Sequence, residues 1–359
     1  MNLVLSLTEQ CNLRCTYCYY KESHAERAKV MGDSVLEAAI QLALERTVAF
    51  RQNFLNITFF GGEPLLRFDA VKHGVEVAKK LVLGIGLKDF RLHFAVNTNG
   101  TLLNDEIIEF LRRENFQIFL SLDGNETRHN ICRKQVNGEG SFAKIAPHIP
   151  KLVKMNVIVL AVVTRENIAG LCESIQWLFD QGFKRLTSAP DFDGHWTEEA
   201  LDALGVEYQK LADLWVELKK SKSPLYLGTI QDKVKIAVED SRYRSYSCHV
   251  YEGGISVATD GSIFPCTRFI ASNPAAPYCQ GNVFTGVDEA RAKEVHDFVH
   301  RDKKDCEGCS LKWRCTAHEC ACTSFYTTGT LDGVSAEVCA HERMLAAICD
   351  EAVDKLLNA

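Results

Sequence analysis

The stretch CNLRCTYCYY, residues 11–20, places three cysteines close together near the start of the chain. Four thiolates normally close a structural metal site, but this loop offers only Cys11, Cys15 and Cys18. His24 is one residue that could complete a zinc site. Three thiolates on a four-iron cluster would instead leave one iron open to a substrate or cofactor. The spacing therefore indicates a metal or iron–sulfur site whose coordination shell is incomplete.

The composition predicts a globular protein with one large domain and a smaller one. The chain has 359 residues, of which 46% are hydrophobic and 25% charged. A net charge of −6 gives no basic surface for nucleic acid. We expect a cytoplasmic protein, because there is no signal peptide and no apolar run of the roughly 20 residues that a membrane span needs. In a reducing cytosol, 15 cysteines favour metal or cluster ligation over disulfides.

Strand and helix patterns alternate from residue 2 to about residue 190, which predicts an α/β fold with a parallel sheet and helices outside it. The expected strands are 2–7, 56–60, 91–96, 117–122, 157–163 and 184–188, and the first helices are 33–50 and 69–83. Polar residues and glycines follow several strands, at 61–64, 97–100 and 121–124. Ligands bind at this edge of a parallel sheet, so we expect these turns to meet loop 8–20 at one site.

The composition changes after a long helix predicted over 197–220. From Ser241 to Ala340 the chain is rich in Cys, Gly and turn residues, which predicts a small domain held together by metal sites. A closing helix is expected over 341–358. We therefore predict a barrel domain, a linker or helix, a cysteine-rich domain and a terminal helix, at residues 1–220, 221–240, 241–345 and 346–359.

The cysteine loop, with an aromatic residue before its last cysteine, and the later strand ending in Gly-Gly-Glu-Pro together resemble radical S-adenosylmethionine (radical SAM) enzymes. The resemblance covers the first 190 residues and implies a partial (β/α)6 TIM-like barrel. It also implies that Cys11, Cys15 and Cys18 hold a catalytic [4Fe–4S] cluster whose open iron binds S-adenosylmethionine. Reductive cleavage of this cofactor then gives a 5′-deoxyadenosyl radical, which abstracts hydrogen from a substrate.

The same resemblance assigns residues to S-adenosylmethionine, namely Tyr17, Gly61, Gly62, Glu63, Asn99, Ser121, Asp123, Arg133 and Thr164. The Gly-Gly-Glu-Pro segment resembles the one that binds the methionyl amino group, and Glu63 can accept from an ammonium. Ser121 and Asp123 would bind ribose or carboxylate groups, and Arg133 would pair with the methionyl carboxylate. Related enzymes often have Asp where this chain has Asn130. Turn formation or packing is an equal interpretation for Asn99, Thr164 and Tyr17.

The C-terminal cysteines resemble the SPASM extension of radical SAM enzymes, which binds two auxiliary [4Fe–4S] clusters, three clusters in all. Carried over by position, the first auxiliary cluster takes Cys248, Cys266 and one of Cys320 or Cys322. Cys279 is a candidate fourth ligand, or that iron is open to substrate. The second auxiliary cluster takes Cys306, Cys309, Cys315 and Cys339. A zinc ribbon is the alternative interpretation of this pattern.

Enzymes with this extension mostly modify peptides or proteins, and two reactions compete. The first is a thioether or carbon–carbon crosslink in a ribosomally synthesised peptide, and the second is oxidation of Cys or Ser to formylglycine in a sulfatase. Enzymes of the second kind usually have Asp after the Pro-Cys of the extension, whereas this chain has Thr267-Arg268. This departure, with the residues at 268–270 and 281–283, favours crosslinking.

The expected partners are a peptide or protein substrate and a one-electron reductant such as flavodoxin or ferredoxin. Because the chain begins at its first strand, a separate leader-recognition protein is a further candidate. Asp191, Asp193 and His195 are weaker candidates for substrate or base chemistry. The non-enzyme alternatives are an iron–sulfur electron carrier and a zinc-stabilised binding protein.

Overall fold

The computed structural model describes residues 1–20, 29–86, 89–238, 253–270 and 276–358. The candidate ligands His24 and Cys248 lie outside these described residues.

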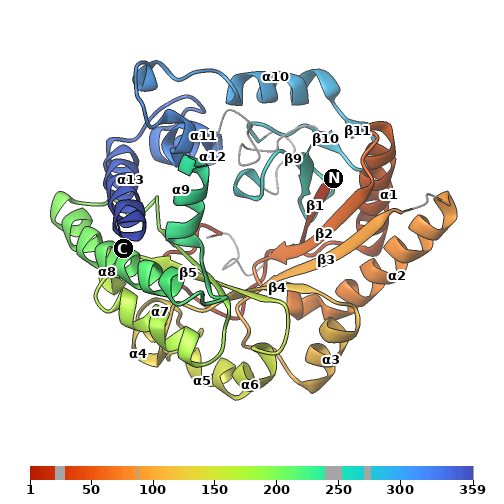
Figure 1. The fold of residues 1–359 in the computed structure, drawn as a ribbon. Coiled ribbons are helices and arrows are strands. Elements are labelled where there is room, and N and C mark those ends of the chain that lie inside the picture. Colours follow the sequence, from red (N-terminus) through yellow and green to blue (C-terminus); the bar gives the residue numbers. More distant parts are fainter. Residues whose placement is uncertain (21–28, 87–88, 239–252, 271–275, 359) are drawn as a thin grey trace.

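A curved, mostly parallel sheet forms the centre of the molecule, as the sequence predicted (Figure 1). Its strands run in the spatial order β7-β6-β5-β4-β3-β2-β1-β8-β9, and β1 to β8 pair in parallel. Only β9 is antiparallel to its neighbour. The strands are β1 (Asn2–Thr8), β2 (Phe54–Gly61), β3 (Arg91–Thr98), β4 (Gln117–Ser121), β5 (Val157–Val163), β6 (Arg185–Pro190), β7 (Tyr226–Leu227), β8 (Gly254–Val257) and β9 (Ile263–Phe264). The short strands β10 (Gly281–Asn282) and β11 (Gly286–Val287) form a separate pair.

Helices such as α1 and α2 cover the outer face of this sheet, and the α/β fold is confirmed (Figure 1). The α-helices of the described residues include others that lie in the C-terminal region. The α-helices are α1 (Asp33–Ala49), α2 (Phe68–Ile85), α3 (Asp105–Arg113), α4 (Glu126–Cys132), α5 (Phe142–Ile145), α6 (Ile149–Leu152), α7 (Leu171–Asp180), α8 (Glu198–Lys220), α9 (Gly228–Val238), α10 (Glu289–Val299), α11 (Thr316–Glu319), α12 (Ala321–Thr328) and α13 (Ala336–Leu357). The last helix begins five residues before the predicted start, because the side chain of Ser335 caps it by accepting from Val338 N at 3.4 Å.

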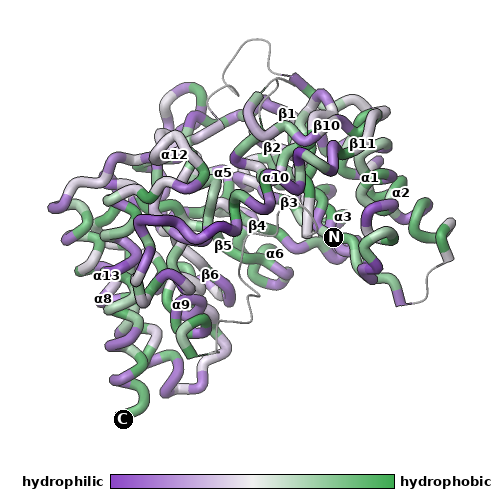
Figure 2. Tube along the Cα trace, turned by 90° about the horizontal axis from the view of Figure 1, so that it is seen from above, coloured by the Kyte–Doolittle hydropathy of each residue, from purple (hydrophilic) through white to green (hydrophobic). Residues whose placement is uncertain are grey.

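The main core lies between the sheet and these helices. Side chains along the strands are alternately more and less buried, as in β5, where Val157, Val159 and Val163 are buried. Phe59, Phe94 and Phe116 stack with ring centroids 5.5–6.5 Å apart. Hydrophobic and hydrophilic positions alternate along α1 and α2 (Figure 2). The buried residues of both helices recur every three or four positions, so one side of each helix packs inward.

The C-terminal region completes the ring that the barrel leaves open (Figure 1). Strand β8 pairs with β1, with Asn2 opposite Gly254 and Leu5 opposite Val257. Helix α13 packs against α8 on the opposite side of the molecule. A second, smaller core contains Phe264, Phe269 and Leu331. The predicted domain boundaries stay predictions, but the sheet itself continues across the expected boundary at residue 241.

No helix among the described residues is both long and apolar enough to cross a membrane.

Candidate active site

The cysteine loop follows the end of β1, and the turn after β2 is hydrogen-bonded to its first residues. Gly62 N donates to Thr8 O at 2.8 Å, and Glu63 N donates to Gln10 O at 2.8 Å. A Cβ atom on Gly62 would lie 2.2 Å from Gln10 O, and one on Gly61 would lie 2.3 Å from Thr8 O. The two glycines therefore allow the β2 turn to approach the backbone at the start of the cysteine loop.

The three thiols of this loop are partly buried, and the sulfur of Cys11 receives hydrogen bonds suited to a cluster ligand. Leu13 N lies 3.4 Å from Cys11 Sγ, and Asn99 Nδ2 lies 3.8 Å from it. Burial raises the pKa of Cys11 to about 11 and that of Cys15 to about 12. A bound cluster would have to supply the positive charge that keeps these sulfurs as thiolates. The residues present fit a three-thiolate cluster site.

Glu63 is fully buried and fixes the turn that follows β3. Its carboxylate accepts from Asn99 N at 2.7 Å, Thr98 Oγ1 at 2.8 Å and Leu65 N at 3.0 Å. Burial raises the pKa of Glu63 to about 7. These bonds set the position of Asn99, whose amide also donates to Asn12 Oδ1 at 3.0 Å. The predicted contact with the methionyl ammonium of S-adenosylmethionine stays a prediction and would share this carboxylate.

Asp123 and Arg133 form a buried ion pair beside Tyr17 of the cysteine loop. The sequence did not predict this pair. Arg133 Nη2 donates to Asp123 Oδ1 at 3.0 Å, and Tyr17 Oη donates to Asp123 Oδ2 at 2.9 Å. Val162 N donates to the same carboxylate at 2.9 Å. Burial alone would raise the pKa of Asp123, but the charge of Arg133 outweighs it and holds that pKa below its usual range. Both residues were predicted to bind S-adenosylmethionine, and that role stays a prediction.

The other two predicted cofactor residues lie at the carboxyl ends of neighbouring strands. Ser121 is the last residue of β4, and Thr164 directly follows β5. Thr164 Oγ1 lies 3.3 Å from Cys132 Sγ, and its backbone N donates to Asn167 Oδ1 at 2.7 Å. The parallel strands thus bring Asn99, Ser121 and Thr164 to the edge that carries the cysteine loop.

A pocket opens beside the cysteine loop at this edge. It is lined by residues 16–19 of the loop, 164–166 after β5, and 191 and 193–195 after β6. Asp193 Oδ2 accepts from Arg268 Nη2 at 3.1 Å, whereas Asp191 has no ion pair with any described residue. Burial and the neighbouring Asp193 raise the pKa of Asp191. The three weaker candidates Asp191, Asp193 and His195 are therefore brought together at one pocket.

Arg268 connects this pocket to the C-terminal region and was missed as a site residue. Its guanidinium carbon lies 4.7 Å from the ring centroid of Tyr19 and 5.2 Å from that of Tyr326. The sequence places Tyr19 inside the cysteine loop, so an aromatic ring able to contact a cation at this site could have been predicted. Nothing local in the sequence links Arg268 to Asp193, because 75 residues separate them.

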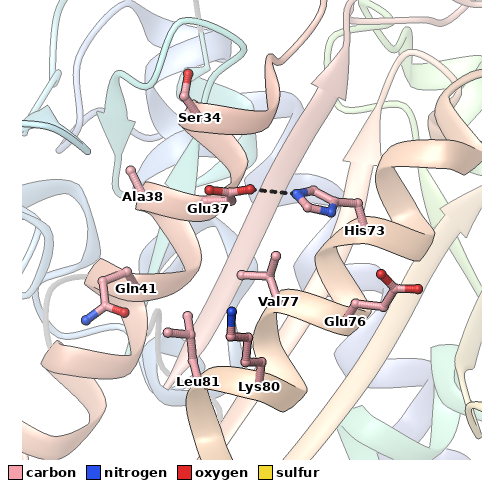
Figure 3. Close-up of a pocket in the computed structure, with 9 residues that line it drawn as sticks. All are labelled: Ser34, Glu37, Ala38, Gln41, His73, Glu76, Val77, Lys80 and Leu81. Carbon is pink, nitrogen blue, oxygen red and sulfur yellow. Dashed lines mark hydrogen bonds and ion pairs between the residues drawn. The ribbon is translucent and has the colours of Figure 1, made fainter. Parts of the chain in front are cut away.

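A second pocket lies elsewhere, between α1 and α2 on the outer layer of helices (Figure 3). Glu37 Oε1 and His73 Nε2 lie 2.8 Å apart across it. None of the predicted site residues lines this groove.

The C-terminal thiols fall into two groups, which correspond to the predicted ligand sets of the two auxiliary clusters. Cys320 Sγ lies 3.1 Å from Cys322 Sγ, which lies 3.9 Å from Cys266 Sγ. Both alternatives for the first auxiliary cluster therefore lie beside Cys266, while the Cys279 thiol donates to Gly281 O at 3.4 Å.

The second group contains Cys306, which interacts electrostatically with Cys309 and Cys339. Cys309 N also donates to Cys306 O at 3.1 Å, and Cys315 stands at the N-terminus of α11. Within the described residues, no three Cys, His, Asp or Glu side chains meet closely enough to hold a single metal ion. The auxiliary ligand sets stay predictions.

Comparison with known proteins identifies the family. The model of the radical SAM superfamily matches residues 5–178. A serine-type anaerobic sulfatase-maturating enzyme of Klebsiella aerogenes is 31% identical over 323 residues, which cover 85% of this chain and 76% of the relative. The chain belongs to the radical SAM superfamily. The cysteine-type anaerobic sulfatase-maturating enzyme of Clostridium perfringens (strain 13 / Type A) is 25% identical over 331 residues, 87% of this chain and 85% of the relative.

The fold of this radical SAM enzyme is also that of a solved relative. The structure of native anSMEcpe with bound AdoMet and Cp18Cys peptide superimposes with a TM-score of 0.79 and 21% identity, and the match covers 99% of both chains. As a radical SAM enzyme, the chain uses S-adenosylmethionine and [4Fe–4S] clusters. The resemblance read from the cysteine loop is thus confirmed, and a three-cluster arrangement is consistent with these relatives.

Proposed function

We propose that this radical SAM enzyme oxidises the side chain of a cysteine or serine in a peptide or protein to an aldehyde. The relatives named as anaerobic sulfatase-maturating enzymes support this reaction over the crosslinking that the sequence favoured. The observation that carries the proposal is the pocket beside Cys18, which brings the carboxylate of Asp191 next to the predicted radical-generating centre.

The reaction removes two hydrogens from the substrate side chain. For serine, one hydrogen atom leaves Cβ, one proton leaves the hydroxyl and one electron is given up, which leaves a C=O bond. Cysteine gives a thioaldehyde by the same losses, and water then converts it to the aldehyde with release of hydrogen sulfide. S-adenosylmethionine and the iron–sulfur clusters, when bound, supply the hydrogen-atom acceptor and the electron acceptor.

The pocket would supply the rest. Asp191 accepts the proton, because burial and Asp193 raise its pKa and no cation among the described residues pairs with it. Asp193 holds Arg268 instead. Thr164 and the loop residues Tyr17 and Tyr19 form the walls that place the substrate side chain and exclude water.

Crosslinking of a ribosomally synthesised peptide is the second candidate, and one observation favours it. Thr267 follows Cys266 where an Asp would be expected for sulfatase maturation, and the next residue, Arg268, is paired with Asp193. A crosslinking enzyme would not need the missing carboxylate at this position.

The test uses anaerobically reconstituted full-length chain, S-adenosylmethionine, dithionite, and peptides that carry a cysteine or serine in a sulfatase-type sequence. We expect 5′-deoxyadenosine to form together with a peptide that reacts with a hydrazide probe, which reveals the aldehyde. A peptide lighter by two hydrogens without a new carbonyl would instead establish crosslinking. Formation of 5′-deoxyadenosine without any change in these peptides would reject them as substrates.

Two matched variants test the role of Asp191. In Asp191→Asn, 5′-deoxyadenosine should still form while aldehyde formation falls on the order of 10²-fold or more. Asp193→Asn removes the same charge two residues away and should lower aldehyde formation less. Equal losses in the two variants would contradict the role of Asp191 as proton acceptor.

A further inference from the structure

Lys303 is a buried cation in the cysteine-rich region that no step described above uses. Its relative exposure is 3%, and among the described residues the one carboxylate that acts on its charge is that of Asp332, which forms no ion pair with it. Its neighbour Lys304 is exposed. An ammonium group that is buried without a directly paired carboxylate is costly.

The contacts of Lys303 place it between the two groups of thiols. Its Nζ donates to Ala317 O at 2.7 Å and also to Ser324 Oγ. Ala317 lies between Cys315 of the second group and Cys320 of the first. Ser324 continues the contact, because its hydroxyl donates to Cys320 O at 3.3 Å.

The backbone of Lys303 faces the second group as well. Its carbonyl oxygen accepts from Cys306 N at 2.9 Å. Burial lowers the pKa of Lys303, and the sulfurs of Cys306, Cys320 and Cys315, together with the carboxylate of Asp332, oppose this shift. Asp332 is exposed, so solvent screens its charge, and the sulfurs of the two groups would become anionic as ligands of bound clusters.

A [4Fe–4S] cluster with four thiolate ligands carries net negative charge, and its charge becomes more negative on reduction. A positive charge held nearby in a dry region stabilises the reduced state more than the oxidised one, so it raises the reduction potential. Bound clusters would in turn compensate the buried ammonium.

We propose that Lys303 is an electrostatic positioning residue that raises the reduction potentials of the auxiliary clusters by standing between their two ligand groups. This inference rests on the presence of auxiliary clusters and is independent of the substrate and of the reaction proposed above. It assigns to Lys303 a role in making these clusters better electron acceptors.

The test measures a potential rather than an activity. In full-length chain with Cys11, Cys15 and Cys18 changed to Ala, the remaining clusters are titrated with dithionite and redox mediators and followed by electron paramagnetic resonance. Lys303→Met should give the reduced signal only at a more negative potential, with iron content unchanged. Lys303→Arg should stay close to the parent, and Lys304→Met should shift little because solvent screens its charge.

Lys303→Gln keeps a donor for Ala317 O while removing the charge. A shift of the midpoint potentials to more negative values in Lys303→Gln, as in Lys303→Met, supports the proposal. Unchanged midpoint potentials in both neutral variants, with iron retained, would overturn it. If both neutral variants lose iron while Lys303→Arg keeps it, the result would still support a requirement for the positive charge. Loss of iron in Lys303→Arg as well would leave Lys303 with a packing role alone.

Discussion

At the candidate site, several residues that were assigned to a ligand already bind one another. Gly62 lies against the backbone of Gln10, and Glu63 is already bound by three donors from the β2 and β3 turns. Asp123 is bound by Arg133 and Tyr17. The residues that the sequence assigned to S-adenosylmethionine thus also form the support that orders the cysteine loop.

Gly62→Ala tests this support. The new Cβ would lie 2.2 Å from Gln10 O, so the loop must shift, and we expect a loss of about 1–3 kcal/mol in unfolding free energy. Iron bound by the cysteine loop should fall in parallel. Gly84→Ala, in α2 with open space around it, is the control: it should leave bound iron unchanged and raise the unfolding free energy by about 0.5–1 kcal/mol. Denaturant unfolding and iron analysis measure the two effects, and a normal iron content in Gly62→Ala would contradict this support role.

Asp123→Asn tests the buried pair. It leaves Arg133 buried without a full counter-charge, so we expect a loss of about 3–5 kcal/mol in unfolding free energy at pH 7. Because the folded pKa of Asp123 is lowered, this stabilisation is present above its unfolded pKa and is lost as the pH falls through the folded value. Asp105→Asn, which removes an exposed pair with Lys151, should change stability little. Urea unfolding at several pH values gives the comparison.

At the scale of elements, α13 is attached to the rest of the molecule by a buried carboxylate. Glu342, in the second turn of α13, is 4% exposed and accepts from Thr316 N of α11 at 2.6 Å. It also pairs with Lys233 of α9. One side chain therefore joins the three helices α9, α11 and α13. Helix α9 follows strand β7 of the sheet and precedes the cysteine-rich region in the sequence.

Glu342→Gln should loosen this junction. Burial would raise the pKa of Glu342, but its bonds to His341 and Lys233 lower it to about 2. The corresponding stabilisation of about 3 kcal/mol is present above pH ~4.5 and is lost as the pH falls towards 2. The difference between parent and variant in unfolding free energy should therefore shrink with acidification. An unchanged difference across this range would contradict the assignment. Lys355→Met, on the exposed face of α13, is the control.

At the scale of the whole molecule, the chain closes on itself through its cysteine-rich end. Strand β8 lies beside β1, and Thr259 Oγ1 just beyond it donates to Glu9 Oε1 of the cysteine loop at 3.3 Å. Arg268 reaches the same loop through Tyr19. The predicted auxiliary clusters and the predicted catalytic cluster are thus held within one continuous structure.

Iron counting tests this arrangement. Three four-iron clusters predict about 12 irons per chain, and the variant with Cys11, Cys15 and Cys18 all changed to Ala should retain about eight. Acid-labile sulfide should fall in the same proportion. Zinc without sulfide would contradict the cluster assignment.

The sequence by itself determined the order of the first six strands, the place of the cysteine loop and the family. These features are written in neighbouring residues: the alternation of β5, the spacing of Cys11, Cys15 and Cys18, and the glycines after β2. The predicted bounds of β5 agree with the structure at both ends. Local periodicity and spacing carry such information because they depend on residues a few positions apart.

Only the tertiary structure decided which distant residues meet. It paired Arg268 with Asp193, brought both Cys320 and Cys322 to Cys266, and placed Lys303 between the thiol groups. It also extended the sheet with β8, which pairs with β1. These contacts join positions that are far apart along the chain, so they arise from packing and burial, which no local pattern records.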